Sequence, residues 1–386
     1  MDFALNEQQR AFQDSARDFA RHELAPFAAR WDEEETFPLD TLRRAGEMGF
    51  LGLYTPACYG GLELSRLDSA IVFEELAHGC TSTAAYLTIH NMVSWMIASF
   101  GAPALAEAWV PRMVTGELLG SYCLTEPGAG SDAASLSTRA ERRGDHYVLN
   151  GSKMFISGAG STQVLVVMAR TGGPGAKGVS AFVVPADAAG VRYGKKEKKM
   201  GWNSQPTRSI SFEEVSIPVA NRLGEEGEGF TFAMKGLDGG RINIATCAVG
   251  TAQAALDAAQ RYVGERRQFG APLAQLQNIQ FRLADMLTEL VAARQMVRLA
   301  AWQLDQQQPE AGCYCAMAKR LATDLAFNVA NQALQCFGGY GYLKDFPLER
   351  HVRDLRVHQI LEGTNDIMRL IIARRLLQEG APEVLR

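Results

Sequence analysis

The sequence predicts an α+β protein of three parts: an N-terminal all-α domain over residues 1–120, a mainly antiparallel β domain over 121–230 and a C-terminal four-helix bundle over 231–386. Three observations lead to this prediction. Apolar residues recur at helical spacing before residue 120, and short apolar runs separated by turn residues follow. After Gly229 the helical spacing returns in long, regular stretches. A chain of 386 residues also exceeds what one hydrophobic core usually supports.

The composition is that of an ordinary globular protein, with 47% hydrophobic and 21% charged residues. The net charge is −4 and no long basic run is present, so we expect no nucleic-acid partner. No apolar stretch approaches the roughly 20 residues of a membrane span. The N-terminus has no secretion signal, so we expect a cytoplasmic protein, or a mitochondrial matrix protein if this is a mature eukaryotic form. The seven cysteines are scattered, and we expect neither a disulfide framework nor a metal site.

The first domain reads as helices. Apolar residues recur at helical spacing over residues 12–51 and again over 67–76. Residues 86–100 are nearly all apolar or small, and this stretch is too short for a membrane span but suits a buried helix. His78 and His90 are isolated, so core or capping histidines are expected rather than metal ligands.

The middle domain reads as strands. The dipeptide Asn150-Gly151 follows the apolar Tyr147–Leu149 and predicts a two-residue hairpin at that point. Because no helical pattern separates the apolar runs, an antiparallel arrangement is expected. The other predicted strands lie at residues 153–156, 164–168, 179–184 and 209–212.

The C-terminal part shows the most regular spacing of the chain. Apolar residues alternate steps of three and four over 242–263, 279–304 and 315–329. Long helices joined by short connections containing Gly or Pro predict a bundle of about four helices.

Glu362 is the candidate catalytic residue. It follows apolar Ile360 and Leu361, precedes Gly363, and is followed at once by a helical pattern. Glu362 is therefore expected on a tight connection just before a helix. Apolar neighbours there would raise its pKa and make it a useful base. On these residues alone, a solvated loop glutamate is the alternative.

Three further segments have residue types suited to ligand binding. Residues 124–132 combine two glycines with hydroxyls, which lets donors approach a ligand closely, although a plain Pro-Gly turn fits equally. Residues 335–342 place three glycines beside aromatics, which suits an aromatic ring and a phosphate or a simple helix C-cap. Residues 265–270 end a helix with two arginines, which could bind a pyrophosphate or form salt bridges. Neither a dinucleotide fingerprint nor a P-loop is present.

Taken together, these segments resemble the acyl-CoA dehydrogenase family, and the resemblance runs from end to end. Residues 123–132 and 335–342 are similar to the two family signatures, and Leu361–Thr364 resembles the loop that carries the family's base. A further similarity is to the branch of the family that acts on isobutyryl-CoA in valine breakdown. It is found in residues 201–208, 239–245, 338–345 and 357–363. Butyryl-CoA and 2-methylbutyryl-CoA are the alternative substrates, because one methylene changes binding by only ~1–3 kcal/mol.

The resemblance implies FAD, bound non-covalently between the β domain and the bundle of a homotetramer, with the sites at dimer interfaces. Phe155 would pack on the flavin and Ser157 would bond near N5, where the family often has Trp and Thr. The other residues implied at the flavin ring are Tyr122, Leu124, Thr125, Thr364, Asn365 and Asp366. From the adjacent subunit, Arg266 would bind the pyrophosphate. The residues implied around the adenosine half are Phe269, Gln277, Gln335, Gly338 and Gly339.

The resemblance also implies an acyl-CoA site and a reaction. Ser131 would reach the FAD phosphate region and the CoA side. Asp238 and Arg241 would contact the CoA moiety, with Arg374 at its adenine end. The family's chemistry would have Glu362 remove the α-proton as the β-hydride passes to flavin N5, and electrons would then leave to electron-transfer flavoprotein.

Competing functions within the fold are an acyl-CoA oxidase, typically longer, and a non-catalytic scaffold, which would have lost the base or flavin residues. Some family members carry the base on the helix that here begins near Asp238. The matching position is Gly240, which has no side chain, so Glu362 is predicted to be the sole base.

Overall fold

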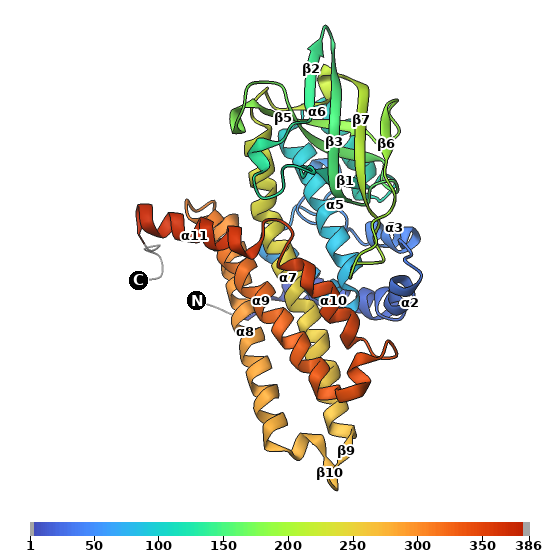
Figure 1. Cartoon of the computed structure of the whole chain (residues 1–386), viewed down its shortest axis with the longest axis vertical. Coiled ribbons are helices and arrows are strands. Elements are labelled where there is room, and N and C mark those ends of the chain that lie inside the picture. The colour runs from blue at the N-terminus through green and yellow to red at the C-terminus, as the bar shows by residue number, and fades with distance from the viewer. Residues whose placement is uncertain (1–3, 381–386) are drawn as a thin grey trace.

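The structure, a computed structural model, describes residues 4–380 of the chain. The N-terminal part is helical, and the long α5 within it confirms the buried helix predicted at residues 86–100. α5 packs against α6 and against elements of both other parts of the chain, so it lies near the centre of the molecule (Figure 1). The helices are α1 (Glu7–Phe19), α2 (Ala28–Glu33), α3 (Leu39–Glu47), α4 (Arg66–Gly79), α5 (Thr81–Phe100) and α6 (Pro103–Val114), with a π-helical turn at Ala20–Leu24.

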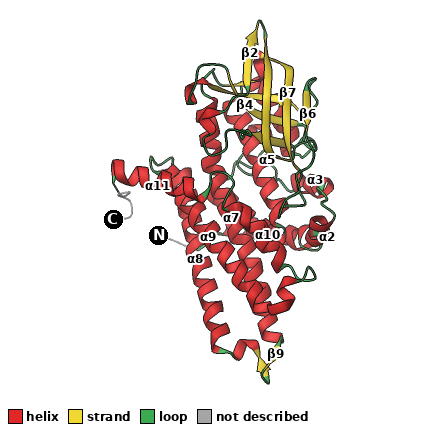
Figure 2. Ribbon diagram, in the orientation of Figure 1, coloured by secondary structure: helices red, strands yellow, loops and turns green. Residues whose placement is uncertain are grey.

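One sheet forms the middle of the chain. Its strands are β1 (Gly120–Cys123), β2 (Arg139–Arg143), β3 (His146–Ser157), β4 (Val164–Arg170), β5 (Val179–Pro185), β6 (Val191–Tyr193), β7 (Thr207–Pro218) and β8 (Arg222–Leu223). The order is β6-β7-β3-β2-β4-β5-β8, with β1 beside β4. The pairing is mainly antiparallel, as predicted, but β1 runs parallel to β4, and β2 meets β4 at a parallel pair. The sheet stands at one end of the molecule (Figure 2).

The predicted hairpin at Asn150-Gly151 is wrong. β3 runs straight through both residues, and the two-residue turn lies earlier, at Gly144-Asp145, where Arg143 pairs with His146. Asn150-Gly151 instead forms a bulge opposite β7, with Gly151 at φ 144°. The Asn150 side chain exchanges hydrogen bonds with Glu214 across this bulge. The left-handed preference of the dipeptide is therefore used to bend a strand rather than to reverse it.

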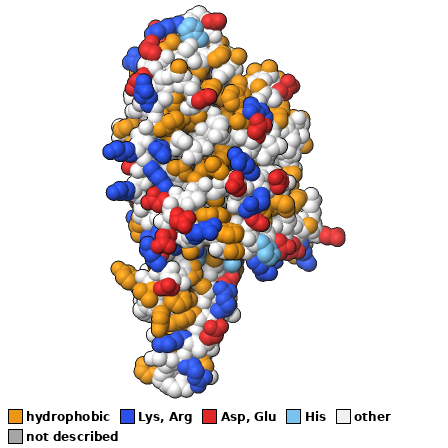
Figure 3. Space-filling model, turned by 90° about the vertical axis from the view of Figure 1, so that its right-hand side faces the viewer, with side chains coloured by type: hydrophobic (Ala, Val, Ile, Leu, Met, Phe, Trp, Pro, Cys, Tyr) orange, Lys and Arg blue, Asp and Glu red, His pale blue; other side chains and the backbone are white. Residues whose placement is uncertain are grey.

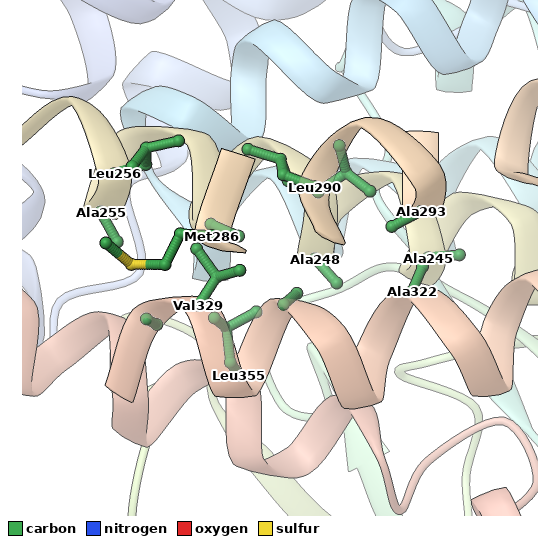
Figure 4. Packing of buried hydrophobic residues seen from close by; sticks show 14 of the residues in the cluster. Ala245, Ala248, Ala255, Leu256, Met286, Leu290, Ala293, Ala322, Val329 and Leu355 are labelled. Atoms are coloured by element: carbon green, nitrogen blue, oxygen red, sulfur yellow. The ribbon is translucent and has the colours of Figure 1, made fainter. Parts of the chain in front are cut away.

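The C-terminal part is built on three long helices, α7 (Gly229–Glu265), α8 (Gln277–Asp305) and α9 (Ala311–Phe337), with α10 (Leu348–His358) packed on α7 and α9. This confirms the predicted helical bundle. Its core is rich in alanine, which lets the helix backbones approach closely, with larger side chains such as Leu290 between them (Figure 4). Two short strands, β9 (Arg267–Gln268) and β10 (Ala271–Pro272), end the bundle opposite the sheet, and α11 (Asn365–Glu379) leaves it sideways (Figure 1).

A buried ion pair holds the loop that follows β1. Lys153 Nζ lies 2.7 Å from Glu126 Oε1, with the two side chains 0% and 3% exposed. Glu126 also accepts hydrogen bonds from the backbone of Ser137 and Thr138. Burial disfavours the carboxylate, but Lys153 and the hydrogen bonds outweigh it and lower the pKa of Glu126 to about 2. Because this pKa is depressed, the stabilisation is present above the ordinary value of 4.5 and is lost as the pH falls toward 2.

We predict that Lys153→Ala lowers the free energy of unfolding by ~3–5 kcal/mol, because it leaves Glu126 buried and uncompensated. The measurement is urea denaturation at one fixed protein concentration. Arg192→Ala is the control, since Arg192 pairs with Glu213 in an exposed bridge worth less than ~1 kcal/mol. Equal losses in the two variants would contradict the prediction.

Candidate active site

Glu362 lies on the tight connection between α10 and α11, where the sequence predicted it. Glu362 and Gly363 both adopt left-handed backbone conformations, with φ 53° and 90°. Such a conformation is uncommon for glutamate and is maintained only where surrounding contacts hold it. The Thr364 hydroxyl accepts a hydrogen bond from Ile367 N and caps α11 directly after this turn.

One oxygen of the Glu362 carboxylate is shut off from water. The residue as a whole is half-buried, but its Oε2 atom is buried and accepts no hydrogen bond from the described residues. Its neighbour Leu361 packs against the apolar cluster that contains Trp202 and Ile244. Burial raises the pKa of Glu362 to about 7, although the charges of Lys319 and Arg241 act in the opposite direction. A carboxyl group with this pKa can exchange a proton near neutral pH.

Gly240 on α7 faces this carboxylate. A Cβ atom added to Gly240 would collide with Glu362 Oε2, so the carboxylate packs against bare helix backbone. Asp238 points elsewhere, because its carboxylate binds the Arg241 guanidinium at 2.6 Å. Asp238 and Arg241 thus lie on α7 within a turn of Gly240, and the charge of Arg241 reaches Glu362.

Sequence reasoning missed Lys319 of α9. Its side chain is completely buried, and its Nζ donates to the Gly363 carbonyl at 2.8 Å and to Asn365 Oδ1 at 2.9 Å. The available signal was a lone cation on an apolar helix face, four residues after Cys315 and three before Ala322. A lysine at such a position requires a specific partner.

The five residues expected beside the flavin from the β domain lie on two adjoining segments. Met154 N donates to the Thr125 carbonyl at 2.8 Å, and Ser121 Oγ donates to the Ser157 carbonyl at 2.7 Å. The two segments are Tyr122–Thr125 and Phe155–Ser157. The Tyr122 hydroxyl is buried without a hydrogen-bond partner among the described residues, and burial, followed by the Glu362 charge, raises its pKa. These segments therefore approach Glu362.

Phe155 has an unusual conformation for a strand residue. Its φ is 59°, at a second bulge between β3 and β7, and its side chain is 63% exposed. A large apolar ring presented to solvent by a strained backbone is typical of a ligand contact.

A second group of predicted residues lies at the far end of the bundle, away from Glu362 (Figure 1). Arg266 is directly C-terminal to α7, and its guanidinium carbon lies 5.5 Å from the centroid of the Tyr340 ring. Phe269 is 93% exposed, and Gly338 has open space beside its Cα atom. This group comprises Arg266, Phe269, Gln277, Gln335, Gly338 and Gly339.

The remaining predicted residues are dispersed. Asn365 is buried against α9, whereas Asp366 is exposed at the start of α11. Ser131 is exposed on the loop after β1, and Arg374 is exposed on α11.

The surface also shows apolar side chains. Phe281, Leu287 and Val291 are exposed on α8, and Leu370, Leu376 and Leu377 on α11. Figure 3 shows hydrophobic side chains gathered on the narrow lower part of the molecule, on the one face that it draws. None of the helices within residues 4–380 has both the length and the apolarity that crossing a membrane requires.

The whole chain matches known proteins. The family descriptions "Acyl-CoA dehydrogenase, N-terminal domain", "middle domain" and "C-terminal domain" match residues 6–117, 121–215 and 227–377. Mitochondrial isobutyryl-CoA dehydrogenase from Bos taurus is 55% identical over 97% of this chain and 90% of that protein.

Two solved structures share the fold closely. Butyryl-CoA dehydrogenase from Megasphaera elsdenii is 39% identical with a TM-score of 0.95, covering 98% of this chain and all of that one. A chain in a structure of the electron transferring flavoprotein of Acidaminococcus fermentans is 40% identical with a TM-score of 0.96, at the same coverage.

Proposed function

The chain belongs to the acyl-CoA dehydrogenase family, and we propose that it is the member that converts isobutyryl-CoA to methacrylyl-CoA, with FAD as cofactor and Glu362 as sole base. As a family member it is a flavin-dependent oxidoreductase. The observation that carries the residue assignment is the Glu362 carboxylate beside Gly240, whose buried Oε2 has no hydrogen-bond partner among residues 4–380. A base kept free of hydrogen bonds is available to a substrate proton.

The proposed chemistry needs Glu362 in its ionised form. A thioester α-proton is weakly acidic, so its removal requires both a base and donors that hold the developing charge on the carbonyl oxygen. The backbone N–H of Glu362 is the proposed donor from this chain. With a pKa of about 7, the carboxylate is a stronger base than an exposed glutamate. Arg241 would bind the CoA moiety from α7, with Asp238 holding its guanidinium.

The residues fit an FAD molecule. The exposed ring of Phe155 offers a face for a flat aromatic group. The Tyr122 hydroxyl, which has no hydrogen-bond partner in the described part of the chain, offers a polar contact beside Glu362. Gly128 and Gly130 leave open space along the loop where a side chain would stand. Bound FAD would supply the acceptor for a hydride. The chain's residues would align the ring, exclude water and hold the base beside the α-carbon.

The two groups of proposed cofactor residues require two subunits. Gly240 adjoins Glu362, while Arg266 is just beyond the other end of α7. Arg266 is 26 positions after Gly240, which corresponds to ~39 Å of helix at 1.5 Å per residue, a distance that one cofactor cannot cover. The exposed apolar residues of α8 and α11 provide surface for association. We therefore propose a homotetramer in which Arg266 of one subunit serves the site of its neighbour.

The assignments of the acyl chain and of the electron acceptor are based on similarity to known proteins. The relative named for isobutyryl-CoA is 55% identical, against 39% for the butyryl-CoA dehydrogenase structure, and this favours isobutyryl-CoA over butyryl-CoA. Electron-transfer flavoprotein is the proposed acceptor, with support from the related chain in the Acidaminococcus structure. For a eukaryotic source the proposed compartment is the mitochondrial matrix, because the Bos taurus relative is named as mitochondrial.

Replacing the base tests its assignment. Glu362→Gln keeps the shape of the side chain but cannot accept a proton, so kcat should fall by ~10²–10⁴ or more while the flavin stays bound. Near-normal turnover would mean that another residue is the base. The control is the double change Glu362→Gly with Gly240→Glu, which should restore part of the activity, since a side chain at Gly240 would enter the space of the Glu362 carboxylate.

Retention of the cofactor tests the proposed pyrophosphate contact. Purified protein should carry one FAD per chain, and Arg266→Ala should lose FAD on dilution or dialysis more readily than Arg267→Ala. Arg267 is the matched control, because it is the next residue, is also exposed and donates to the Gly270 carbonyl. The measurement is flavin absorbance per chain, and equal retention in both variants would count against the assignment.

Steady-state kinetics over short straight and branched acyl-CoAs, with electron-transfer flavoprotein as acceptor, test the substrate. Isobutyryl-CoA should have the highest kcat/KM. A tenfold preference for butyryl-CoA or 2-methylbutyryl-CoA, about 1.4 kcal/mol in transition-state binding, would refute the substrate assignment. Peroxide production as fast as turnover with the flavoprotein would instead indicate an oxidase.

A further inference from the structure

We propose that Lys319 is a positioning residue for the reaction: it holds the connection that carries Glu362 and places a positive charge near the carboxylate. This inference rests on the proposed role of Glu362 as the base. Lys319 lies on α9, outside all the segments in which the sequence suggested chemistry. A completely buried lysine is rare unless its charge and donors are used.

Hydrogen bonds from Lys319 hold the backbone just after Glu362. Lys319 Nζ donates to the Gly363 carbonyl and to Asn365 Oδ1, the residues one and three positions after Glu362. Asn365 Nδ2 in turn donates to Asp324 Oδ1 at 2.7 Å and to Thr323 Oγ1 at 2.9 Å. One turn of α9 thus fixes the C-terminal side of a connection whose backbone is left-handed at both Glu362 and Gly363.

Lys319 also places a charge close to Glu362. Among the described residues, Lys319 forms no ion pair with a carboxylate, because both of its partners are neutral oxygens. The charge of Lys319 therefore acts on Glu362 through space. Burial lowers the pKa of Lys319 to about 7, and the Glu362 carboxylate acts in the opposite direction. Each buried group thus favours the charged form of the other.

The other groups that face this pair are either paired or neutral. The Arg241 guanidinium on α7 is already bound by Asp238. Asp324 on α9 lies within ion-pair distance of Arg320 and Arg369. His358 on α10 is neutral, since burial lowers its pKa to about 3. Burial also raises the pKa of the remaining neighbours, which stay uncharged near neutral pH; these are Tyr54, Tyr122 and Cys247.

The consequence for catalysis follows from the sign of the interaction. A positive charge favours the ionised carboxylate, so it lowers the pKa that burial alone would give Glu362. Removing the charge should therefore raise the pKa of the base and leave a larger fraction protonated at neutral pH. The fall of kcat/KM on the acidic side should then begin at a higher pH.

The test is the pH profile of kcat/KM for the preferred acyl-CoA with the FAD-loaded enzyme. Lys319→Gln keeps a hydrogen-bond donor but carries no charge. The pH at which kcat/KM falls on the acidic side should therefore rise by roughly one unit, which is tenfold in activity on that side. Lys319→Arg keeps a charge, so its kcat/KM should fall on the acidic side at the same pH as that of the wild type. Thr323→Val, which removes a hydroxyl from the same network without changing a charge, should also leave this pH unchanged.

Several outcomes would overturn the proposal. One is a Lys319→Gln variant whose kcat/KM falls on the acidic side at the same pH as that of the wild type. Another is a loss of kcat/KM of the same size at every pH, which a purely structural role would give. Flavin absorbance and thermal unfolding verify that each variant is folded and loaded. Should Lys319→Gln not fold, Lys319→Met gives the same comparison without the donor. A wild-type enzyme that is inactive with every acyl-CoA would instead refute the proposed function. That outcome can be told apart from a failure of the Lys319 proposal, which requires an active wild-type enzyme.

Discussion

The rest of the structure depends on keeping one oxygen of the Glu362 carboxylate out of water. Burying an ionised group without a direct partner is unfavourable by several kcal/mol, and chains usually avoid it by exposing the group or pairing it. Glu362 as a residue is only half-buried, but its Oε2 is buried and accepts no hydrogen bond within residues 4–380. Three elements maintain this arrangement: the bare backbone of α7 at Gly240, the buried Lys319 of α9, and a turn that is left-handed at two successive residues.

The N-terminal side of the same turn is fixed by α10, which is joined to both other parts of the chain. Arg353 donates to Asp32 of α2, to Glu349 of its own helix and to the Met200 carbonyl. Asp354 accepts a 2.6 Å hydrogen bond from the Trp202 backbone. Gly201 lies so close to α10 that an added Cβ would meet its backbone. The position of the base therefore depends on contacts that span the whole sequence.

These dependencies explain what the sequence could and could not predict. Hydrophobic spacing predicted the helices and the place of Glu362 before a helix, because both follow from local patterns. The hairpin predicted at Asn150-Gly151 was wrong, because pairing with β7 across the sheet decides the conformation there. Lys319 was missed because its partners, Gly363 and Asn365, lie more than forty residues away in sequence. Tertiary contacts of this kind leave only a weak signal, a polar residue at a core position.

The proposed site also links cofactor binding to assembly. The residues around Glu362 and those around Arg266 are separated by most of α7, so one subunit offers only half of the proposed contacts to each FAD. A ligand that needs two subunits stabilises their association, and association in turn raises affinity for the ligand by the same free energy. The strained Phe155 and exposed Phe269 are then reasonable features of an isolated chain, because each presents an apolar ring to a surface that is completed only in the assembly. Under this proposal, the long α7 helix packs against the base at Gly240 and also carries Arg266 to the site of a neighbouring subunit.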